Sequence, residues 1–182
     1  MDHQVIEQEL KRSGITFQVV QEEKNTLTIL TGPDDVKLSF FGGLGMGRVG
    51  KPTRTEDGLV SVASPLDLLA TKLKVIMQRA EAKDYLDVAQ LLRGRVSLIQ
   101  GLGAARTMYG PAFAPSECLR ALTFFDDGDL PTVDSETRQV LRNEAAAASR
   151  IYPIPEIPAV SKQLGEERMF GRRDLERGDL DR

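Results

Sequence analysis

The 182-residue sequence has no tryptophan, one cysteine and one histidine, and each scarcity removes a class of protein. Cys118 alone can form neither an internal disulfide nor a cysteine-based metal site. His3 stands near the chain start, so most serine–histidine–aspartate, cysteine–histidine and histidine–metal schemes are removed as well. Any chemistry of this chain is therefore expected to rest on carboxylates, lysines and arginines.

Long apolar runs and a strong charge bias are also missing. The apolar runs are too short to span a bilayer, and the first ten residues, MDHQVIEQEL, are acidic and polar rather than those of a secretion signal. The formal net charge of -3 gives no global case for nucleic-acid binding, although a local basic groove remains compatible with it. These features predict a cytoplasmic protein without a membrane segment.

The first third of the chain has a strand-like pattern. After a short helix expected over residues 3–12, segments 15–20, 26–31 and 36–41 are rich in Val, Ile, Thr and Phe and are separated by turn residues. A fourth short strand is expected over residues 59–62. Short connections of this kind favour antiparallel neighbours.

From Ser64 onward the pattern becomes helical. Ser64 is placed to cap a helix that begins at Pro65 and keeps a 3.6-residue apolar period as far as Ala80. Four further helices are expected, over residues 83–93, 98–109 (capped by Ser97), 116–125 and 135–150. The three closely spaced prolines of YPIPEIPAV predict an extended segment, and from Ser161 the mixed charges predict a flexible tail.

The glycine-rich stretch FFGGLGMGRVGKPT, residues 40–53, resembles a phosphate-binding loop. Gly45, Gly47 and Gly50 fit G-x-G-x-x-G, but that motif must open a helix, and here polar residues and a strand follow. A P-loop also needs Ser or Thr after its lysine, where this chain has Pro52. A flexible connection between two strands is the favoured interpretation. A helix that begins at Lys51 would instead support a dinucleotide-binding domain.

The more informative stretch is SPLDLLATKLKVIMQRAEAKDYLDVAQLL, residues 64–92. On a helical projection Lys72 and Arg79 align on one border of the first apolar stripe. On the next helix Asp84 falls inside the apolar face, and Asp87 lies just outside it. A carboxylate in a core-facing position needs a cation, and Lys72 and Arg79 are the nearest candidates. The pattern leaves two interpretations open: a structural ion-pair network, or a cationic floor for phosphates.

The same stretch closely resembles the AbiEii/AbiGii nucleotidyltransferase-like toxins of type IV toxin–antitoxin systems, which carry a K-L helix followed by an R-x-x-x-K-D-x-x-D helix. The resemblance extends more loosely over residues 15–135. It implies an α+β, nucleotidyltransferase-like fold: a small mixed or antiparallel sheet of about four strands, followed by a helical C-terminal part. It also implies nucleoside triphosphate and Mg²⁺ as cofactors, with an antitoxin and tRNA as partners. The candidate site residues are Asp84 and Asp87 for catalysis, and Lys72, Arg79 and Lys83 for nucleotide binding.

The chain departs from this family in its carboxylates. The family's metal site is a G-S followed by D-x-D, and no such motif occurs in residues 1–182. The later strand VKLSFF has Ser39 where many relatives have a third carboxylate. The expectation is a chain that starts after the metal-binding half, with no metal ligands of its own and degraded or truncated catalysis. The alternative is a non-catalytic module that keeps the fold and binds itself, an antitoxin or RNA.

Three regions are expected along the chain. Residues 1–62 form a partial nucleotidyltransferase α/β region, residues 63–150 a helical region, and residues 151–182 a proline-rich and then charged tail. A sheet without its first strand and helix would present an open edge and an uncovered face. A homodimer through that face is therefore predicted.

Overall fold

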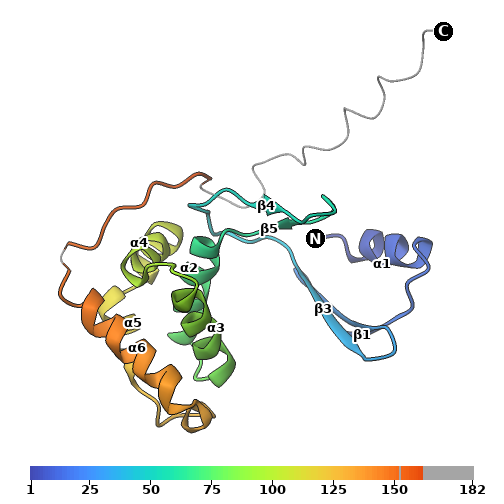
Figure 1. Ribbon diagram of the computed structural model, residues 1–182. Helices are drawn as coiled ribbons and strands as arrows, with labels where there is room; N and C mark the ends of the chain where they lie inside the picture. The colour runs from blue at the N-terminus through green and yellow to red at the C-terminus, as the bar shows by residue number, and fades with distance from the viewer. Residues whose placement is uncertain (152, 162–182) are drawn as a thin grey trace. The chain divides into compact units, whose positions relative to one another are not determined.

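The computed structural model describes residues 1–151 and 153–161, and these form two compact units. The first unit comprises Met1–Gly45, and the second contains residues 46–161 of the described chain (Figure 1). No helix within the described residues is long and apolar enough to cross a membrane. The expected charged tail lies, apart from Ser161, outside the described residues.

The helices and the first three strands follow the order expected from the sequence, and the short strand β4 is an addition to it. The strands are β1 (Phe17–Glu23), β2 (Thr26–Thr31), β3 (Val36–Phe41), β4 (Thr53–Arg54) and β5 (Ser61–Val62). The helices are α1 (His3–Arg12), α2 (Pro65–Ile76), α3 (Ala82–Arg93), α4 (Leu98–Tyr109), α5 (Pro115–Thr123) and α6 (Ser135–Ala148), with short 3₁₀ turns at Gly110–Ala112 and Leu130–Thr132.

The first unit is an antiparallel meander in the order β1-β2-β3. Its central strand buries Leu27 and Ile29 completely, whereas the outer strands β1 and β3 are almost wholly exposed. Leu27 lies directly opposite Phe40, and Phe40 shares a small surface hollow with α1 residues Ile6 and Leu10. Helix α1 therefore covers the sheet face that carries Leu27.

The opposite face of the meander carries Thr28, Ser39 and Phe41. Residue 39, the position where the family resemblance suggested a carboxylate, holds a serine whose hydroxyl is hydrogen-bonded to that of Thr28 at 3.0 Å. Phe41, at the end of β3, is 61% exposed. This face thus leaves a large aromatic side chain in solvent.

The fourth expected strand does not join this sheet. Only Ser61–Val62 is a strand, and it pairs with Thr53–Arg54 in a separate antiparallel ribbon. The expected α+β fold, with a small antiparallel sheet before a helical part, is confirmed; the sheet has three strands, and the fourth expected strand lies in the separate ribbon. The glycine loop leads into β4 rather than into a helix at Lys51, so the context required for a dinucleotide fold is missing.

The second unit is a helical bundle in which α2 contacts α3, α4 and α5, and α6 packs on α5 (Figure 1). Leu69, Leu73 and Leu102 are fully buried at its centre. Helix α2 approaches α4 closely at Gly101, where an added Cβ would lie 2.5 Å from a Leu69 methyl. Because that distance is far below van der Waals contact, only glycine permits this packing.

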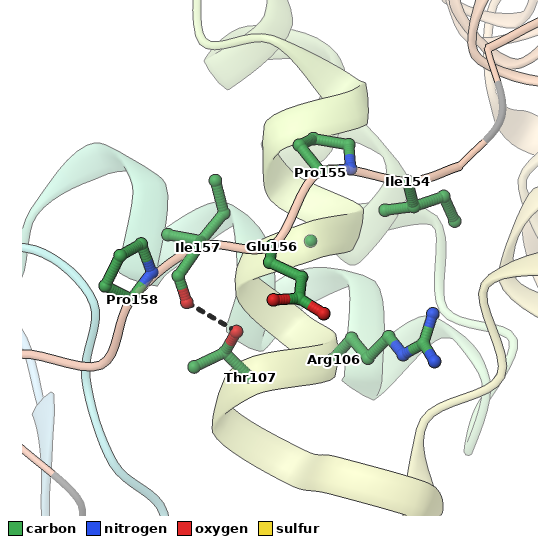
Figure 2. Close-up of a pocket in the computed structure, with 8 residues that line it drawn as sticks. Arg106, Thr107, Ile154, Pro155, Glu156, Ile157 and Pro158 are labelled. Atoms are coloured by element: carbon green, nitrogen blue, oxygen red, sulfur yellow. Dashed lines mark hydrogen bonds between the residues drawn. The ribbon is translucent and has the colours of Figure 1, made fainter.

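The proline-rich segment is extended, as expected, and lies along α4 (Figure 2). Thr107 Oγ1 donates a hydrogen bond to the Ile157 carbonyl at 2.7 Å, and a Cβ on Gly103 would overlap the Pro155 carbonyl. Beyond it, the amide of Arg48 donates to the carbonyl of Ser161 at 2.9 Å. The segment thereby covers one side of α4 and ends beside the glycine loop.

Candidate functional site: an ion-pair cluster between two helices

The candidate site lies at the link between α2 and α3. Ser64 caps α2, since its hydroxyl accepts from the Asp67 amide at 3.1 Å. The helix ends at Ile76, short of the expected Ala80, so Arg79 lies in the link between the helices. The prediction that Lys72 and Arg79 align on a single helix is therefore wrong.

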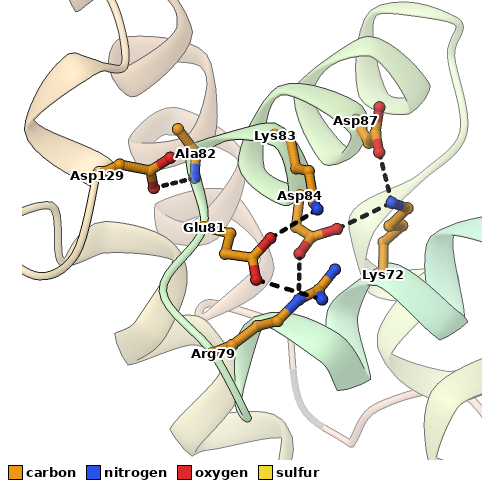
Figure 3. A network of polar contacts seen from close by, with 8 residues as sticks. All are labelled: Lys72, Arg79, Glu81, Ala82, Lys83, Asp84, Asp87 and Asp129. Carbon is orange, nitrogen blue, oxygen red and sulfur yellow. Dashed lines mark hydrogen bonds and ion pairs between the residues drawn. The ribbon is translucent and has the colours of Figure 1, made fainter. Parts of the chain in front are cut away.

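Helix α3 starts with a cap from a distant loop. Its N-cap residue, Glu81, makes no side-chain cap, and the Ala82 amide instead donates to Asp129 Oδ1 at 2.6 Å (Figure 3). Gly128, next to that aspartate, packs so tightly on the Ala80 carbonyl that a Cβ would overlap it. This contact fixes the link that carries Arg79. Sequence reasoning missed Asp129, because no local pattern connects it with residues so much earlier in the chain.

Asp84 is the centre of the cluster and is 0% exposed (Figure 3). Its Oδ1 accepts from Lys72 Nζ at 2.9 Å, and its Oδ2 accepts from Arg79 Nε at 2.8 Å. The predicted pairing of a buried carboxylate with these two cations is confirmed. Both oxygens have a charged donor, as a buried carboxylate requires.

Further carboxylates hold the two cations from the solvent side. Lys72 also pairs with Asp87 at 2.5 Å, and Arg79 Nη1 pairs with Glu81 at 3.3 Å. Glu81 in turn pairs with Lys83 at 2.8 Å. We call these five residues together with Asp84 the helix-pair cluster; its three cations and three carboxylates balance in formal charge. An anion that binds here must therefore compete with carboxylates already present.

Exposure separates the members of the cluster. The side chains of Lys72, Arg79 and Lys83 are 30%, 44% and 66% exposed, and that of Asp87 is 53% exposed. The predicted nucleotide-binding cations thus reach solvent, whereas Asp84 does not.

The pKa values of the central ion pair follow from opposing effects. Burial alone would raise the pKa of Asp84, but the hydrogen bonds from Arg79 and Lys72 outweigh it and hold that pKa below its usual value. Burial would lower the pKa of Lys72, yet Asp87 and Asp84 together raise it. The charged form of both groups is therefore favoured around neutral pH.

Tyr85 joins the cluster's helix to α5. Its hydroxyl donates to the Ala121 carbonyl at 3.1 Å, and its ring meets Phe125 edge-on at 5.9 Å. Burial raises the pKa of this phenol to about 12. Tyr85 is accordingly a packing residue that holds α3 against α5 and stays protonated near neutral pH.

The glycine loop is held by a second carboxylate that sequence reasoning missed. Asp67 Oδ1 accepts from the Val49 amide at 2.7 Å, and Oδ2 accepts from the Gly50 amide at 3.0 Å and from the Ser64 hydroxyl at 2.7 Å. The Ser64-x-x-Asp67 spacing was the available signal, because it resembles a capping box. Two backbone amides of the glycine loop, which in a phosphate-binding loop would face the ligand, thus bind a side chain of this protein.

The cluster is a poor fit for a divalent cation. Within residues 1–151 and 153–161, no group of three or more His, Cys, Asp or Glu side chains is arranged to hold a metal. Both oxygens of Asp84 already accept from cations, and Asp87 faces the ammonium of Lys72. Magnesium needs free carboxylate oxygens, so these residues do not fit it.

An antiparallel sheet that is followed in the chain by a helical bundle, with a Lys-Arg-Asp cluster on the first helices of the bundle, is consistent with a nucleotidyltransferase-like fold. Residues 2–161 match the family described as Nucleotidyl transferase AbiEii toxin, Type IV TA system. The chain belongs to this family. No curated protein and no solved structure matches it significantly.

Proposed function

We propose that the chain is a nucleotidyltransferase-like protein of the AbiEii type that binds the triphosphate of a nucleotide at the helix-pair cluster. The supporting observation is the geometry of Asp84, which is fully buried and holds Lys72 and Arg79 on its two oxygens. Fixed in this way, both cations keep hydrogen-bond donors for a ligand, because lysine has three N–H groups and arginine has five. Lys83, more exposed, adds a third positive charge.

Within this proposal the two aspartates have different roles. Asp84 is a positioning residue, since its carboxylate is used up on the cations and has no exposed surface. Asp87 is half-exposed beside Lys72 and is the carboxylate able to meet an acceptor hydroxyl. Nucleotidyl transfer in this family generally uses nucleoside triphosphate and Mg²⁺. Because the sequence has no G-S…D-x-D motif, we propose that catalysis is degraded or incomplete in this chain.

Family membership also suggests the biological setting. A type IV toxin–antitoxin protein has a cognate antitoxin, and tRNA is the acceptor we propose for any residual transfer. A cytoplasmic location accords with both.

Calorimetric titration with ATP, GTP, CTP and UTP, with and without Mg²⁺, tests the proposal. We expect Lys83→Ala to weaken binding several-fold without changing the melting temperature, because Lys83 is exposed and its one ion-pair partner among the described residues is the partly exposed Glu81. Lys74→Ala is the matched control: this lysine lies on α2 and donates to the Ala112 carbonyl, away from the cluster. Absence of heat with all four nucleotides, or equal losses in both variants, would refute nucleotide binding at the cluster.

A second candidate is a non-catalytic module that dimerises, or binds an antitoxin or RNA. The balanced charges of the helix-pair cluster favour it, since a neutral ion-pair network is sufficient to lock two helices together. The exposed strands β1 and β3 and the solvent-facing Phe41 supply an edge and an apolar patch for self-association.

Size-exclusion chromatography with light scattering tests the dimer. We expect the wild type to run as a homodimer at micromolar concentration and Phe41→Lys to run as a monomer, since a charge in an apolar interface is not solvated. Leu59→Lys, in the loop between β4 and β5 of the other unit, controls for the added charge, because Leu59 is 82% exposed. A wild-type monomer at high concentration contradicts the prediction.

A further inference from the structure

A groove between α5 and α6 is separate from the helix-pair cluster. It has a volume of about 650 Å³ and is walled by these two helices, and Arg106 of α4 and Ile154 of the extended segment also line it. A volume of this order holds a few large side chains rather than a whole helix. Regular helices form most of its walls, so the groove exists before any ligand arrives.

The charge of the groove is opposite to that of the chain. Arg106, Arg120 and Arg142 line it, and no Asp or Glu does, although the protein has a net charge of -3. Within the described residues, Arg106 and Arg120 make no side-chain ion pair or hydrogen bond. The guanidinium carbon of Arg142 lies 5.2 Å from the centre of the Phe125 ring, which orients it by a cation–π contact.

The floor of the groove is apolar. Leu119 of α5 and Ala145 and Ala148 of α6 contribute to it, and Ile151, which is 49% exposed, lies at its rim. Small alanine side chains on α6 allow another backbone to approach closely. An apolar floor between unpaired arginines is complementary to a ligand that has an apolar stripe flanked by carboxylates.

We propose that this groove binds an acidic amphipathic helix of a partner protein. Such a helix places aliphatic side chains at i, i+4 and i+7 on the apolar floor, while its flanking glutamates or aspartates pair with the three arginines. Single-stranded nucleic acid fits less well, because no aromatic side chain lines the groove to stack on a base. The proposal does not depend on nucleotide binding at the helix-pair cluster.

Fluorescence anisotropy with a designed probe tests it on the full chain. The probe is a labelled peptide of about sixteen residues, enough for several helical turns, with leucines at i, i+4 and i+7 and glutamates on both sides of them. A scrambled peptide, a peptide with lysine in place of every glutamate, and a single-stranded RNA oligonucleotide are run in parallel. The protein variants are the double reversal Arg106→Glu/Arg120→Glu, and Ala146→Trp, which fills the groove from an exposed position.

Arg150→Glu is the matched control, because Arg150 is exposed just beyond α6 and does not line the groove. We expect saturable binding of the glutamate probe that weakens at least about tenfold in the double reversal and in Ala146→Trp, but not in the control. The lysine peptide should regain binding to the double reversal. Equal binding of the scrambled peptide, no binding of the glutamate probe, or preference for the RNA overturns the proposal.

Discussion

Replacing Asp84 by alanine removes the one fully buried carboxylate of the helix-pair cluster. Two charge-assisted hydrogen bonds, of 2.9 and 2.8 Å, disappear with it. Breaking a buried ion pair typically costs about 3–5 kcal/mol. Here the cations it leaves behind are 30% and 44% exposed, and they keep Asp87 and Glu81 as partners. We therefore expect a smaller loss, about 2–4 kcal/mol of unfolding free energy.

Urea unfolding followed by circular dichroism at the helical band measures this loss, because α2 to α6 all belong to the second unit. With a slope of about 2 kcal/mol per molar urea, in the middle of the typical range, the midpoint should fall by about 1–2 M. Asp87→Ala is the matched control: it is on the same helix and half-exposed, and its loss should cost at most about 1 kcal/mol.

A double variant isolates the ion pair itself. If Lys72 and Asp84 stabilise each other, Lys72→Met combined with Asp84→Ala should cost less than the sum of the two single changes, by about 0.5–3 kcal/mol. Strict additivity, or equal effects of Asp84→Ala and Asp87→Ala, would refute the argument that burial makes Asp84 the centre of the cluster.

Acid should destabilise the wild type more than Asp84→Asn. The pKa of Asp84 in the folded protein lies below its unfolded value of about 3.9. The stability that ionised Asp84 contributes is therefore present above a pH of about 3.9 and is lost as the pH falls through the folded pKa. Urea midpoints at pH 7 and pH 3 measure this loss of stability, and equal losses in the two proteins contradict the prediction. Gly50→Ala should destabilise by about 1–3 kcal/mol, because its Cβ would overlap the Ser64 hydroxyl and lie 2.8 Å from Asp67 Oδ2. Gly45→Ala, in the same loop with open space around it, should leave the stability nearly unchanged. Thermal melts of the two variants measure the difference, and equal losses would contradict the role of Asp67 in holding the loop.

Local patterns predicted most of the elements. The bounds of β2, β3 and α4 agree with the sequence expectation, because turn residues and apolar periodicity mark those ends clearly. Ser97 occupies the expected N-cap position of α4, but its side chain makes no cap hydrogen bond. The placement of Asp84 inside an apolar face also identified its two cationic partners, since a buried charge allows few solutions.

Contacts between residues far apart in the chain could not be predicted from the sequence. Helix α2 stops before Arg79 in a link held by Asp129 and Gly128, which come from a much later loop. The hydrogen bond from the Val49 amide to Asp67 depends on tertiary packing in the same way. Such contacts have no periodicity, so hydrophobic patterning does not reveal them.

The extended segment that runs along α4 has a consequence for the order of folding. Its pairing with Arg48 links the first residues of the helical unit to its last described ones, and Gly103 and Thr107 complete their contacts only when this segment arrives. Contacts that span so much of the chain form late, because they close a long loop. On the ribosome, the bundle would therefore keep one side of α4 bare until synthesis has passed the prolines.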